Sequence, residues 1–317
     1  MIAASDKTDS TLGMVFPGQG SQSVGMLAGL ADAYPQVAAT FSEASEVLGY
    51  DLWDLVRDGP ADDLNRTDRT QPAMLAAGVA VWRIWQARDG GMPVVMAGHS
   101  LGEYTALVCA GTLNYAEAIG LVAERGRCMQ DAVLAGSGAM AAILGLDDAA
   151  VAKVCSKAAQ GGVVTAVNFN SPGQVVIAGD AQAVQRATVL AKETGAKRAV
   201  PLPVSVPSHC ALMQPAAERF AAHLEKTAFA APLIPVIQNV DVMAHDSPDS
   251  IRDALERQLY SPVQWVRTIE AMRERGVTRI IEAGPGKVLA GLCKRIDKSL
   301  TALPVHDPDS LDAALGS

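Results

Sequence analysis

The chain has 317 residues, of which 49% are hydrophobic and 19% charged, so it has the length of about two domains and ample apolar side chains for a core. The formal net charge of −8 argues against a nucleic-acid-binding protein, which needs a basic surface. The five cysteines are widely spaced and form no CxxC pair, which indicates no metal site and no disulfide framework and fits a reducing compartment. Because no run reaches about 18 uncharged apolar residues, we expect a cytoplasmic protein that does not enter the membrane.

The first part of the chain alternates short apolar runs with longer helical patterns. Residues 1–11 carry Asp6 and Asp9 and lack an apolar run, so we expect a loose tail and not a signal peptide. A continuous apolar run is typical of a buried parallel strand. We therefore expect strands at 12–16 and 94–97 and helices at 27–48, 71–88, 101–110 and 115–134, the first helix broken near Pro35.

The pattern changes after residue 134. We expect a strand–helix–strand–strand–helix–strand order at 139–144, 147–159, 163–169, 174–178, 181–194 and 197–201. This βαββαβ order is that of a ferredoxin-like domain. After Pro203 the alternation of strands and helices resumes, at 232–236, 251–259, 278–281 and 288–296. The sequence thus predicts an α/β protein in which residues 12–133 and 204–317 form one domain with a parallel sheet and residues 134–203 form an inserted ferredoxin-like domain, with a site in the cleft between them.

The segment Gly98-His99-Ser100-Leu101-Gly102 fits the G-x-S-x-G pattern and lies between a predicted buried strand and a predicted helix. Glycines on both sides permit the sharp turn, and the N-terminal end of the helix favours negative charge near the serine oxygen. The five residues alone would also fit a serine that caps the helix. The strand–turn–helix setting favours Ser100 as the nucleophile of an acyl transfer.

A serine hydroxyl needs a base, and the chain offers five histidines. His99 is adjacent to Ser100, but neighbouring side chains in such a turn diverge, so we expect it to be structural. A surface position is the simpler interpretation for His223, His245 and His306. We favour His209, which lies where the chain returns from the inserted domain, although a structural loop histidine fits this position as well. No acidic residue stands out as the third member that usually orients such a base.

Five segments together resemble the malonyl-CoA:acyl carrier protein transacylase family, in that family's order and over nearly the whole chain after residue 12. They are Phe16-Pro17-Gly18-Gln19-Gly20-Ser21-Gln22, Gly98-His99-Ser100-Leu101-Gly102-Glu103-Tyr104, Asn168-Phe169-Asn170-Ser171-Pro172-Gly173-Gln174, Val206-Pro207-Ser208-His209 and Gly284-Pro285-Gly286. The resemblance implies a hydrolase-like α/β domain interrupted by a ferredoxin-like domain. It also implies transfer of a malonyl group from malonyl-CoA to an acyl carrier protein, with no cofactor.

The resemblance implies a role for six residues. Ser100 would be the nucleophile, His209 the base, and the backbone N–H groups of Gln19 and Leu101 the oxyanion hole. The carbonyl of Gln258 would orient the histidine in place of an acid. Arg125 would hold the malonyl carboxylate, because a guanidinium offers a planar pair of donors, whereas we expect a structural role for its neighbour Arg127.

Two other functions use the same residues. A serine hydrolase would pass the acyl group to water, and a carrier-protein docking module would bind without catalysis. The related acyltransferases of polyketide synthesis are a third alternative to a role in fatty-acid synthesis. Since carrier proteins are acidic, we expect a basic docking surface at Lys287, Lys294, Arg295 and Lys298, which would otherwise be a solvated helix face. We expect a monomer.

Overall fold

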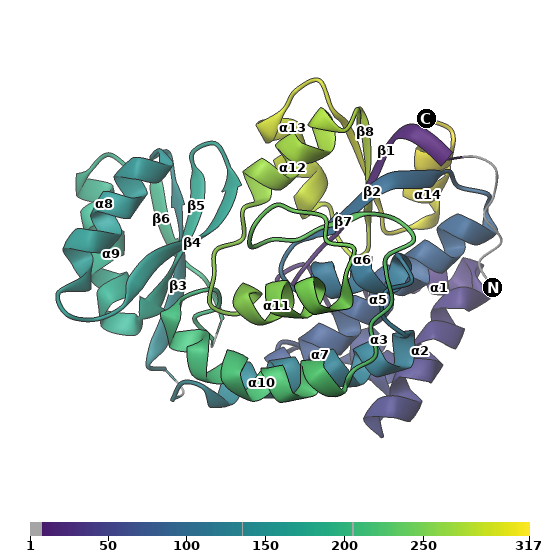
Figure 1. Cartoon of the computed structure of the whole chain (residues 1–317), viewed down its shortest axis with the longest axis horizontal. Helices are drawn as coiled ribbons and strands as arrows, with labels where there is room; N and C mark the ends of the chain where they lie inside the picture. The colour runs from purple at the N-terminus through teal and green to yellow at the C-terminus, as the bar shows by residue number, and fades with distance from the viewer. Residues whose placement is uncertain (1–7, 135, 205) are drawn as a thin grey trace.

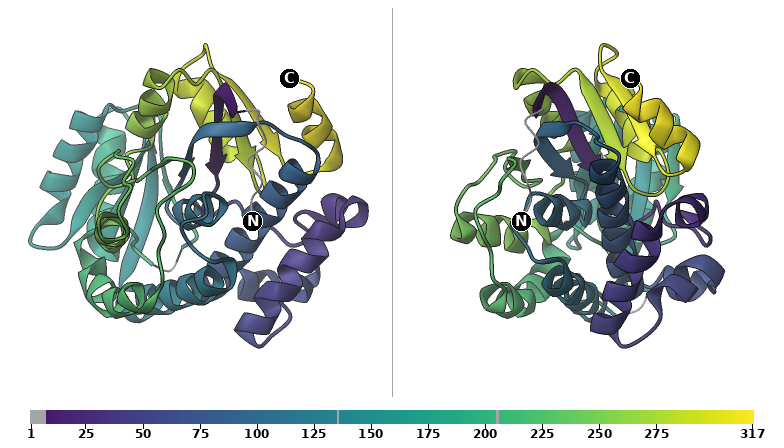
Figure 2. Two further views of the ribbon diagram at one scale, coloured as in Figure 1. Left: turned by 45° about the vertical axis from the view of Figure 1, so that its right-hand side comes forward. Right: turned by 90° about the vertical axis from the view of Figure 1, so that its right-hand side faces the viewer.

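The computed structural model describes residues 8–134, 136–204 and 206–317, which form two sheets with helices packed around them (Figure 1). The larger sheet is parallel throughout, with the strand order β7-β2-β1-β8-β9. Its strands are β1 (Thr8–Phe16), β2 (Met92–Gly98), β7 (Val236–Ile237), β8 (Arg279–Ala283) and β9 (Thr301–Val305). Figure 2 shows β1, in purple, inside this sheet between the blue and the yellow-green strands.

Helices cover both faces of the larger sheet. Their bounds are α1 (Ala28–Ala33), α2 (Pro35–Leu48), α3 (Leu52–Asp58), α4 (Ala61–Leu64), α5 (Thr67–Ala87), α6 (Gly102–Cys109), α7 (Tyr115–Asp131), α10 (Gln214–Lys226), α11 (Pro248–Gln258), α12 (Trp265–Glu274), α13 (Val288–Ile296) and α14 (Pro308–Leu315), with a 3₁₀ turn at Ala211–Met213. Alternate side chains of β1 enter different cores, as the period of a strand requires: Met14 and Phe16 pack with α5, α6 and α7, whereas Val15 packs with α12 and α13. Both faces of the sheet are therefore buried.

The second sheet is antiparallel and comes from one continuous segment, on the left of Figure 1. The chain order is β3 (Gly138–Leu144), α8 (Asp148–Ala159), β4 (Val164–Ser171), β5 (Gln174–Asp180), α9 (Ala181–Glu193) and β6 (Arg198–Pro201), and the strand order is β4-β5-β3-β6. Both helices pack on one face over a core that includes Ile143, Val175 and Ile177. The other face carries Met140 and Val176 and turns toward the larger unit.

The expected tail at residues 1–11 is wrong for residues 8–11, and residues 1–7 lie outside the described part of the chain. Strand β1 begins at Thr8, four residues before the expected start, and Thr8 and Asp9 pair with Met92 and Pro93. The carboxylate of Asp9 accepts a hydrogen bond of 2.9 Å from Arg279 on β8. These first strand residues are mostly exposed, so they lack the apolar run on which the expectation depended.

The break expected near Pro35 is present, since α1 ends at Ala33 and Pro35 opens α2, where its missing N–H costs nothing. The helix expected at 71–88 begins earlier, at Thr67, so that Pro72 lies inside it. Helices α3, α4, α12 and α14 and strand β9 had no predicted counterpart, and no bounds were predicted for α10. No helix in the described ranges has the length and apolar character needed to cross a membrane.

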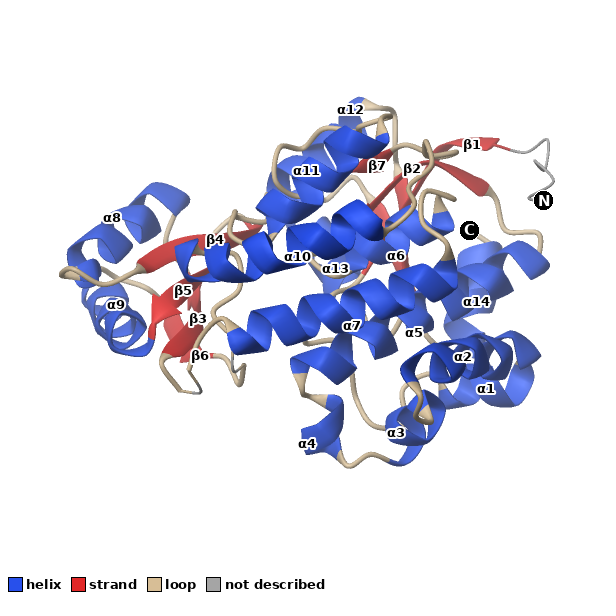
Figure 3. Cartoon of the chain, turned by 60° about the horizontal axis from the view of Figure 1, so that its bottom comes forward, coloured by secondary structure: helices blue, strands red, loops and turns tan. Residues whose placement is uncertain are grey.

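The largest helices of the first core lie against one another. Figure 3 shows α7 and α10 side by side, and α5 packs behind α7. This arrangement places the middle of α7, which carries Arg125, under the turn between β2 and α6.

Candidate active site

Ser100 lies in the turn between β2 and α6, in a backbone conformation that the fold imposes. Its φ of 52° is in the left-handed region, which costs a residue with a Cβ roughly 1–2 kcal/mol. The turn is tight on both sides: a Cβ on Gly98 would lie 1.8 Å from the carbonyl carbon of Gly102, and one on Gly102 would lie 2.1 Å from the Phe16 oxygen. Only glycine fits these two positions, and the resulting turn exposes the Ser100 hydroxyl to a pocket.

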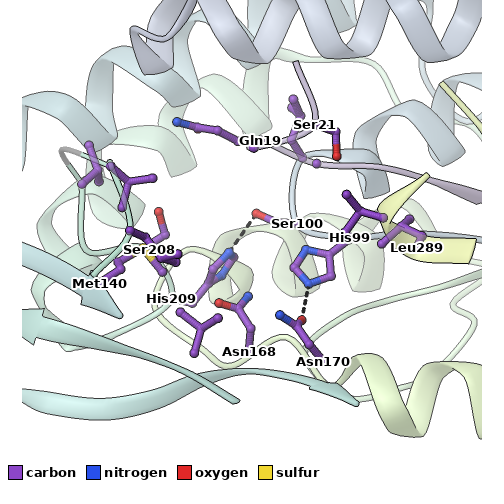
Figure 4. Close-up of a pocket in the computed structure, with 18 of the residues that line it drawn as sticks. Gln19, Ser21, His99, Ser100, Met140, Asn168, Asn170, Ser208, His209 and Leu289 are labelled. Atoms are coloured by element: carbon purple, nitrogen blue, oxygen red, sulfur yellow. Dashed lines mark hydrogen bonds between the residues drawn. The ribbon is translucent and has the colours of Figure 1, made fainter. Parts of the chain in front are cut away.

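His209 contacts this hydroxyl directly. Its Nε2 lies 2.8 Å from Ser100 Oγ, and its Nδ1 lies 2.8 Å from the carbonyl oxygen of Gln258 (Figure 4 shows the first contact). A carbonyl only accepts, so Nδ1 carries the hydrogen of the neutral ring and Nε2 is left to accept the serine proton. The backbone N–H of His209 donates to the carbonyl oxygen of Leu259 at 2.9 Å, which holds the main chain at His209.

The electrostatic surroundings keep His209 neutral. The ring is 97% buried, since only 3% of the residue's surface is exposed. Burial, and then the positive charge of Arg125, lowers the pKa of His209 to about 3. The imidazole is therefore unprotonated at neutral pH, the state that a general base requires.

Arg125 lies below Ser100 on α7 and is 1% exposed. Its Nη1 donates to Gln71 Oε1 and its Nη2 to Gln258 Oε1, both at 2.9 Å, and Nη2 is 3.4 Å from Ser100 Oγ. The guanidinium carbon is 5.3 Å from the centre of the Tyr104 ring. Neutral amides and an aromatic face thus hold the cation in place.

This arginine has no ion-pair partner among the residues that the structure describes. Burial lowers the pKa of Arg125, and Tyr104 and Glu103 act in the opposite direction. A buried cation without a carboxylate is costly for the folded protein. Because Arg125 also lines the pocket, it is placed to receive a carboxylate from a ligand.

Gln19 and Leu101 lie on the same pocket as Ser100. Neither of their backbone N–H groups donates a hydrogen bond to another described residue, whereas the N–H groups of Gly20, Gly102 and Glu103 do. Unpaired donors beside a nucleophile are what an oxyanion hole requires.

The other four histidines and Arg127, all in the described ranges, make no hydrogen bond to the Ser100 hydroxyl. His99 contacts Asn170, with 2.8 Å between Nε2 and Oδ1, and its ring lies beside that of Trp265. The other residues make surface or structural contacts: His223 stacks on Phe220, His245 pairs with Asp241, His306 pairs with Asp307, and Arg127 pairs with Glu124 on its own helix.

Four residues for which the sequence predicted no role complete the site, although Glu103 and Asn170 lie within the segments that carry the family resemblance. Gln71 holds Arg125, Asn170 holds His99, Asn239 contacts the backbone of Ser100 at 2.7 Å, and Glu103 accepts a hydrogen bond from Asn239 at 2.6 Å. One signal was available for Asn239: it is the second residue after β7, and side chains at the carboxyl ends of parallel strands meet at one edge of the sheet.

The pocket lies between the two sheets. Ser100, Leu101, Arg125 and His209 line it from the larger unit, and an opposite wall of Met140, Asn168, Asn170 and Val176 lines it from the smaller sheet. Figure 4 labels Ser100 and His209 together with Met140, Asn168 and Asn170 of this wall. The start of α13 and the loop after β1 complete the rim. In the described ranges, no group of three or more histidine, cysteine or acidic side chains is arranged to hold a metal ion.

Comparison with known proteins identifies the family. A family model for the acyl transferase domain matches residues 14–309. The malonyl CoA-acyl carrier protein transacylase of Salmonella typhimurium is 60% identical over 95% of this chain and 97% of that relative, and that of Bacillus subtilis is 44% identical over 96% of each.

Solved structures agree with this assignment. An acyl carrier protein S-malonyltransferase from Vibrio cholerae superposes with a TM-score of 0.93 at 64% identity, covering 96% of this chain and 99% of that one. A malonyl-transacylase in complex with a type II PKS acyl-carrier protein superposes with a TM-score of 0.95 at 57% identity, over 96% and 99% of the two chains. The chain belongs to the acyl transferase family, and within it to the malonyl-CoA:acyl carrier protein transacylases.

Proposed function

We propose that this acyltransferase moves a malonyl group from malonyl-CoA to the phosphopantetheine thiol of an acyl carrier protein through a malonyl-Ser100 intermediate, supplying extender units for fatty-acid synthesis. One observation carries the proposal: Ser100 Oγ lies 2.8 Å from His209 Nε2 and 3.4 Å from Arg125 Nη2. A nucleophile, a neutral base and a cation that pairs with no described carboxylate thus meet at one atom.

In the first half-reaction, Ser100 Oγ attacks the thioester carbonyl while its proton passes to His209 Nε2. The N–H groups of Gln19 and Leu101 stabilise the oxyanion that forms. The imidazolium is stabilised through Nδ1–H by the carbonyl of Gln258, a neutral acceptor that favours it less than a carboxylate would. Collapse of the intermediate expels CoA, which takes the proton from His209, and leaves malonyl-Ser100.

The free carboxylate of the malonyl group would bind Arg125. Gln71 and Gln258 hold the guanidinium through its two terminal nitrogens. Its weak 3.4 Å contact with Ser100 Oγ is the one that an arriving carboxylate would replace. Selection of a dicarboxylic acyl group follows from the charge pairing.

In the second half-reaction, the carrier thiol gives its proton to His209 and attacks malonyl-Ser100. The malonyl group leaves on the carrier, and the proton returns to Ser100. The sequence thioester, oxyester, thioester involves no change of oxidation state, so the proposed reaction calls for no metal or redox cofactor.

The carrier would dock at the rim of the pocket near α13. The first turn of this helix lines the pocket through Val288 and Leu289. Lys287, Lys294, Arg295 and Lys298 are all exposed on or beside the same helix. Replacing the three lysines together should raise the KM for the acidic carrier and flatten its salt dependence, with little change for malonyl-CoA.

We also propose the finer description of the fold. The βαββαβ chain order and the β4-β5-β3-β6 strand order support a ferredoxin-like domain at 134–203, inserted into a hydrolase-like domain formed by 12–133 and 204–317. One chain supplies every residue of the proposed site, which supports a monomer. The five reduced and buried cysteines fit a cytoplasmic enzyme.

A comparison of transfer rates among CoA thioesters tests this function. The purified protein is mixed with holo-carrier protein and with malonyl-, methylmalonyl-, acetyl- or butyryl-CoA, and the mass of the carrier is followed. We expect malonyl transfer to be at least about tenfold faster than acetyl transfer. Release of free malonate without acylation of the carrier would instead identify a hydrolase, and neither product would identify a docking module.

A further inference from the structure

The peptide groups on both sides of Ser100 are held by side chains from distant parts of the chain. Asn239 Oδ1 accepts the N–H of Ser100 at 2.7 Å, and Asn239 Nδ2 donates to the carbonyl oxygen of Gly98 at 2.6 Å. One amide side chain thus spans the turn on which the nucleophile lies. It is completely buried, so water does not compete for these two bonds.

Asn239 is itself anchored to the helix that follows the nucleophile. Its backbone N–H donates to Glu103 Oε2 at 2.6 Å, and its carbonyl oxygen accepts from the N–H of Gln264 at 3.2 Å. Glu103 lies in the first turn of α6, three residues after Ser100. The end of β7, the turn and the start of α6 are therefore tied together through one residue.

The peptide group after Ser100 is fixed separately. The Ser100 carbonyl oxygen accepts from Gln258 Nε2 at 3.1 Å and from the N–H of Glu103 at 3.0 Å. In a trans peptide the C=O and N–H point in opposite directions, so these bonds direct the N–H of Leu101 away from them. Because Asn239 already occupies the N–H of Ser100, Leu101 is the member of this turn whose N–H is left for an oxyanion.

We propose that Asn239 is a positioning residue, which holds the turn so that Ser100 Oγ faces His209 and the Leu101 N–H faces the reacting carbonyl. The inference rests on the proposed function of Ser100 as the nucleophile. It explains how a left-handed residue with a Cβ persists at this turn: both of its neighbouring peptide groups are held by buried hydrogen bonds.

The direct test is Asn239→Ala, with Gln238→Ala as the matched control. Gln238 is the preceding residue and equally buried, but its side-chain atoms have no hydrogen-bond partner in the described ranges. The rate of Ser100 malonylation is measured by rapid quench and intact mass, together with the KM for malonyl-CoA and the melting temperature. We expect the rate to fall on the order of a hundredfold in Asn239→Ala with a KM within about threefold of the original, and to change less than twofold in the control.

Asn239→Asp covers the case in which Asn239→Ala does not fold. This variant keeps the size and the acceptor for Ser100 and loses the donor to Gly98, so we expect at least a tenfold slower malonylation. An unchanged rate constant in either folded variant would overturn the proposal, as would a loss confined to KM.

A neutral acyl probe separates this inference from the proposed function. p-Nitrophenyl acetate reports the reactivity of the Ser100–His209 pair without the malonyl carboxylate, so Asn239→Ala should slow its reaction by a similar factor. If the unaltered protein reacts with this probe but not with malonyl-CoA, the proposed function fails while the effect of Asn239 is still measured. Equal probe rates in the Asn239→Ala variant and the unaltered protein would overturn the positioning role alone.

Discussion

The two sheets contribute to the pocket in different ways. The parallel sheet contributes residues that follow the carboxyl ends of its strands: Gln19 follows β1 and Ser100 follows β2. Asn239 follows β7 and contacts the backbone of Ser100 without lining the pocket. The antiparallel sheet contributes side chains from the face of its strands, such as Met140 on β3 and Val176 on β5. The proposed nucleophile and oxyanion donors thus follow strand ends of the parallel sheet, whereas His209 lies in the loop after β6 and Arg125 on α7. The face of the antiparallel sheet supplies side chains that shape the space.

This difference follows from what each kind of structure can hold. The ends of parallel strands turn sharply and expose backbone N–H groups, which suits a nucleophile and its oxyanion hole. A strand face presents a regular surface with alternate side chains, which suits a wall. The comparison predicts that substitutions in the loops at the strand ends change the rate of the chemical step. Substitutions in the wall formed by the antiparallel sheet should instead change the KM for malonyl-CoA.

Removal of the base should produce the largest effect. His209→Ala leaves Ser100 without a proton acceptor, so we expect the rate of malonylation to fall about 10³-fold or more. His223→Gln is the control, because His223 stacks on Phe220 on α10 and should leave the rate unchanged. A rate in His209→Ala within tenfold of the original would show that another group takes the proton.

Arg125→Ala should change the substrate more than the chemistry. We expect malonyl transfer to fall by roughly ten- to a hundredfold and acetyl transfer to be maintained or rise. The buried charge that attracts a carboxylate is gone, and an uncharged acyl group no longer leaves a buried cation without a partner. Arg127→Ala is the matched control on the same helix, where the arginine pairs with Glu124 on the surface. Unchanged malonyl and acetyl rates in Arg125→Ala would contradict the assignment.

Glu103→Gln should change the pH dependence of stability. Burial raises the pKa of Glu103 to about 8, above the ordinary value of 4.5. Between these two values the folded protein holds a proton that the unfolded chain has lost, so stability falls as pH rises, by at most about 1.4 kcal/mol per pH unit. Glutamine keeps an acceptor for Asn239 without titrating. Urea unfolding at pH 5, 6.5 and 8 should show the variant gaining stability over the original as pH rises, and parallel curves would contradict this.

The smallest expected effect is in the wall. Val176→Ala removes two methyl groups from the pocket side of β5, so we expect the KM for malonyl-CoA to change less than about fivefold and kcat to stay the same. Val175→Ala, its neighbour, removes the same atoms from the core under α8 and α9 and should lower the melting temperature without changing KM. A large loss of kcat in Val176→Ala would remove the distinction between the two sheets.

Local sequence signals predicted the parts of the fold that depend on local chemistry. The strand, the sharp turn and the helix around Ser100 are neighbours in sequence. Glycine is required at 98 and 102 because a Cβ at either position would collide with backbone atoms. Proline at 35 marked a helix boundary for an equally local reason. The start of β1 at Thr8 was missed because its pairing with Met92 leaves no apolar pattern.

In the site, too, local signals identified some residues and missed those that depend on long-range contacts. Ser100 and His209 were identifiable by residue type and context, whereas Asn239 and Gln71 act through side-chain amides that meet their partners across long stretches of chain. An amide has no periodicity and no charge to mark it. Residue types alone left the third member of the site unassigned, and only the family resemblance pointed to Gln258. The structure places the backbone carbonyl of Gln258 2.8 Å from His209 Nδ1.

The central claim is a covalent malonyl-Ser100 intermediate that a carrier thiol discharges. The direct measurement is peptide mass mapping after brief exposure to malonyl-CoA, followed by a chase with holo-carrier protein. The mechanism predicts a malonyl mass on the peptide that contains Ser100, its disappearance during the chase with equal gain on the carrier, and no label in Ser100→Ala. A carrier that becomes malonylated at the original rate by the Ser100→Ala variant would contradict it.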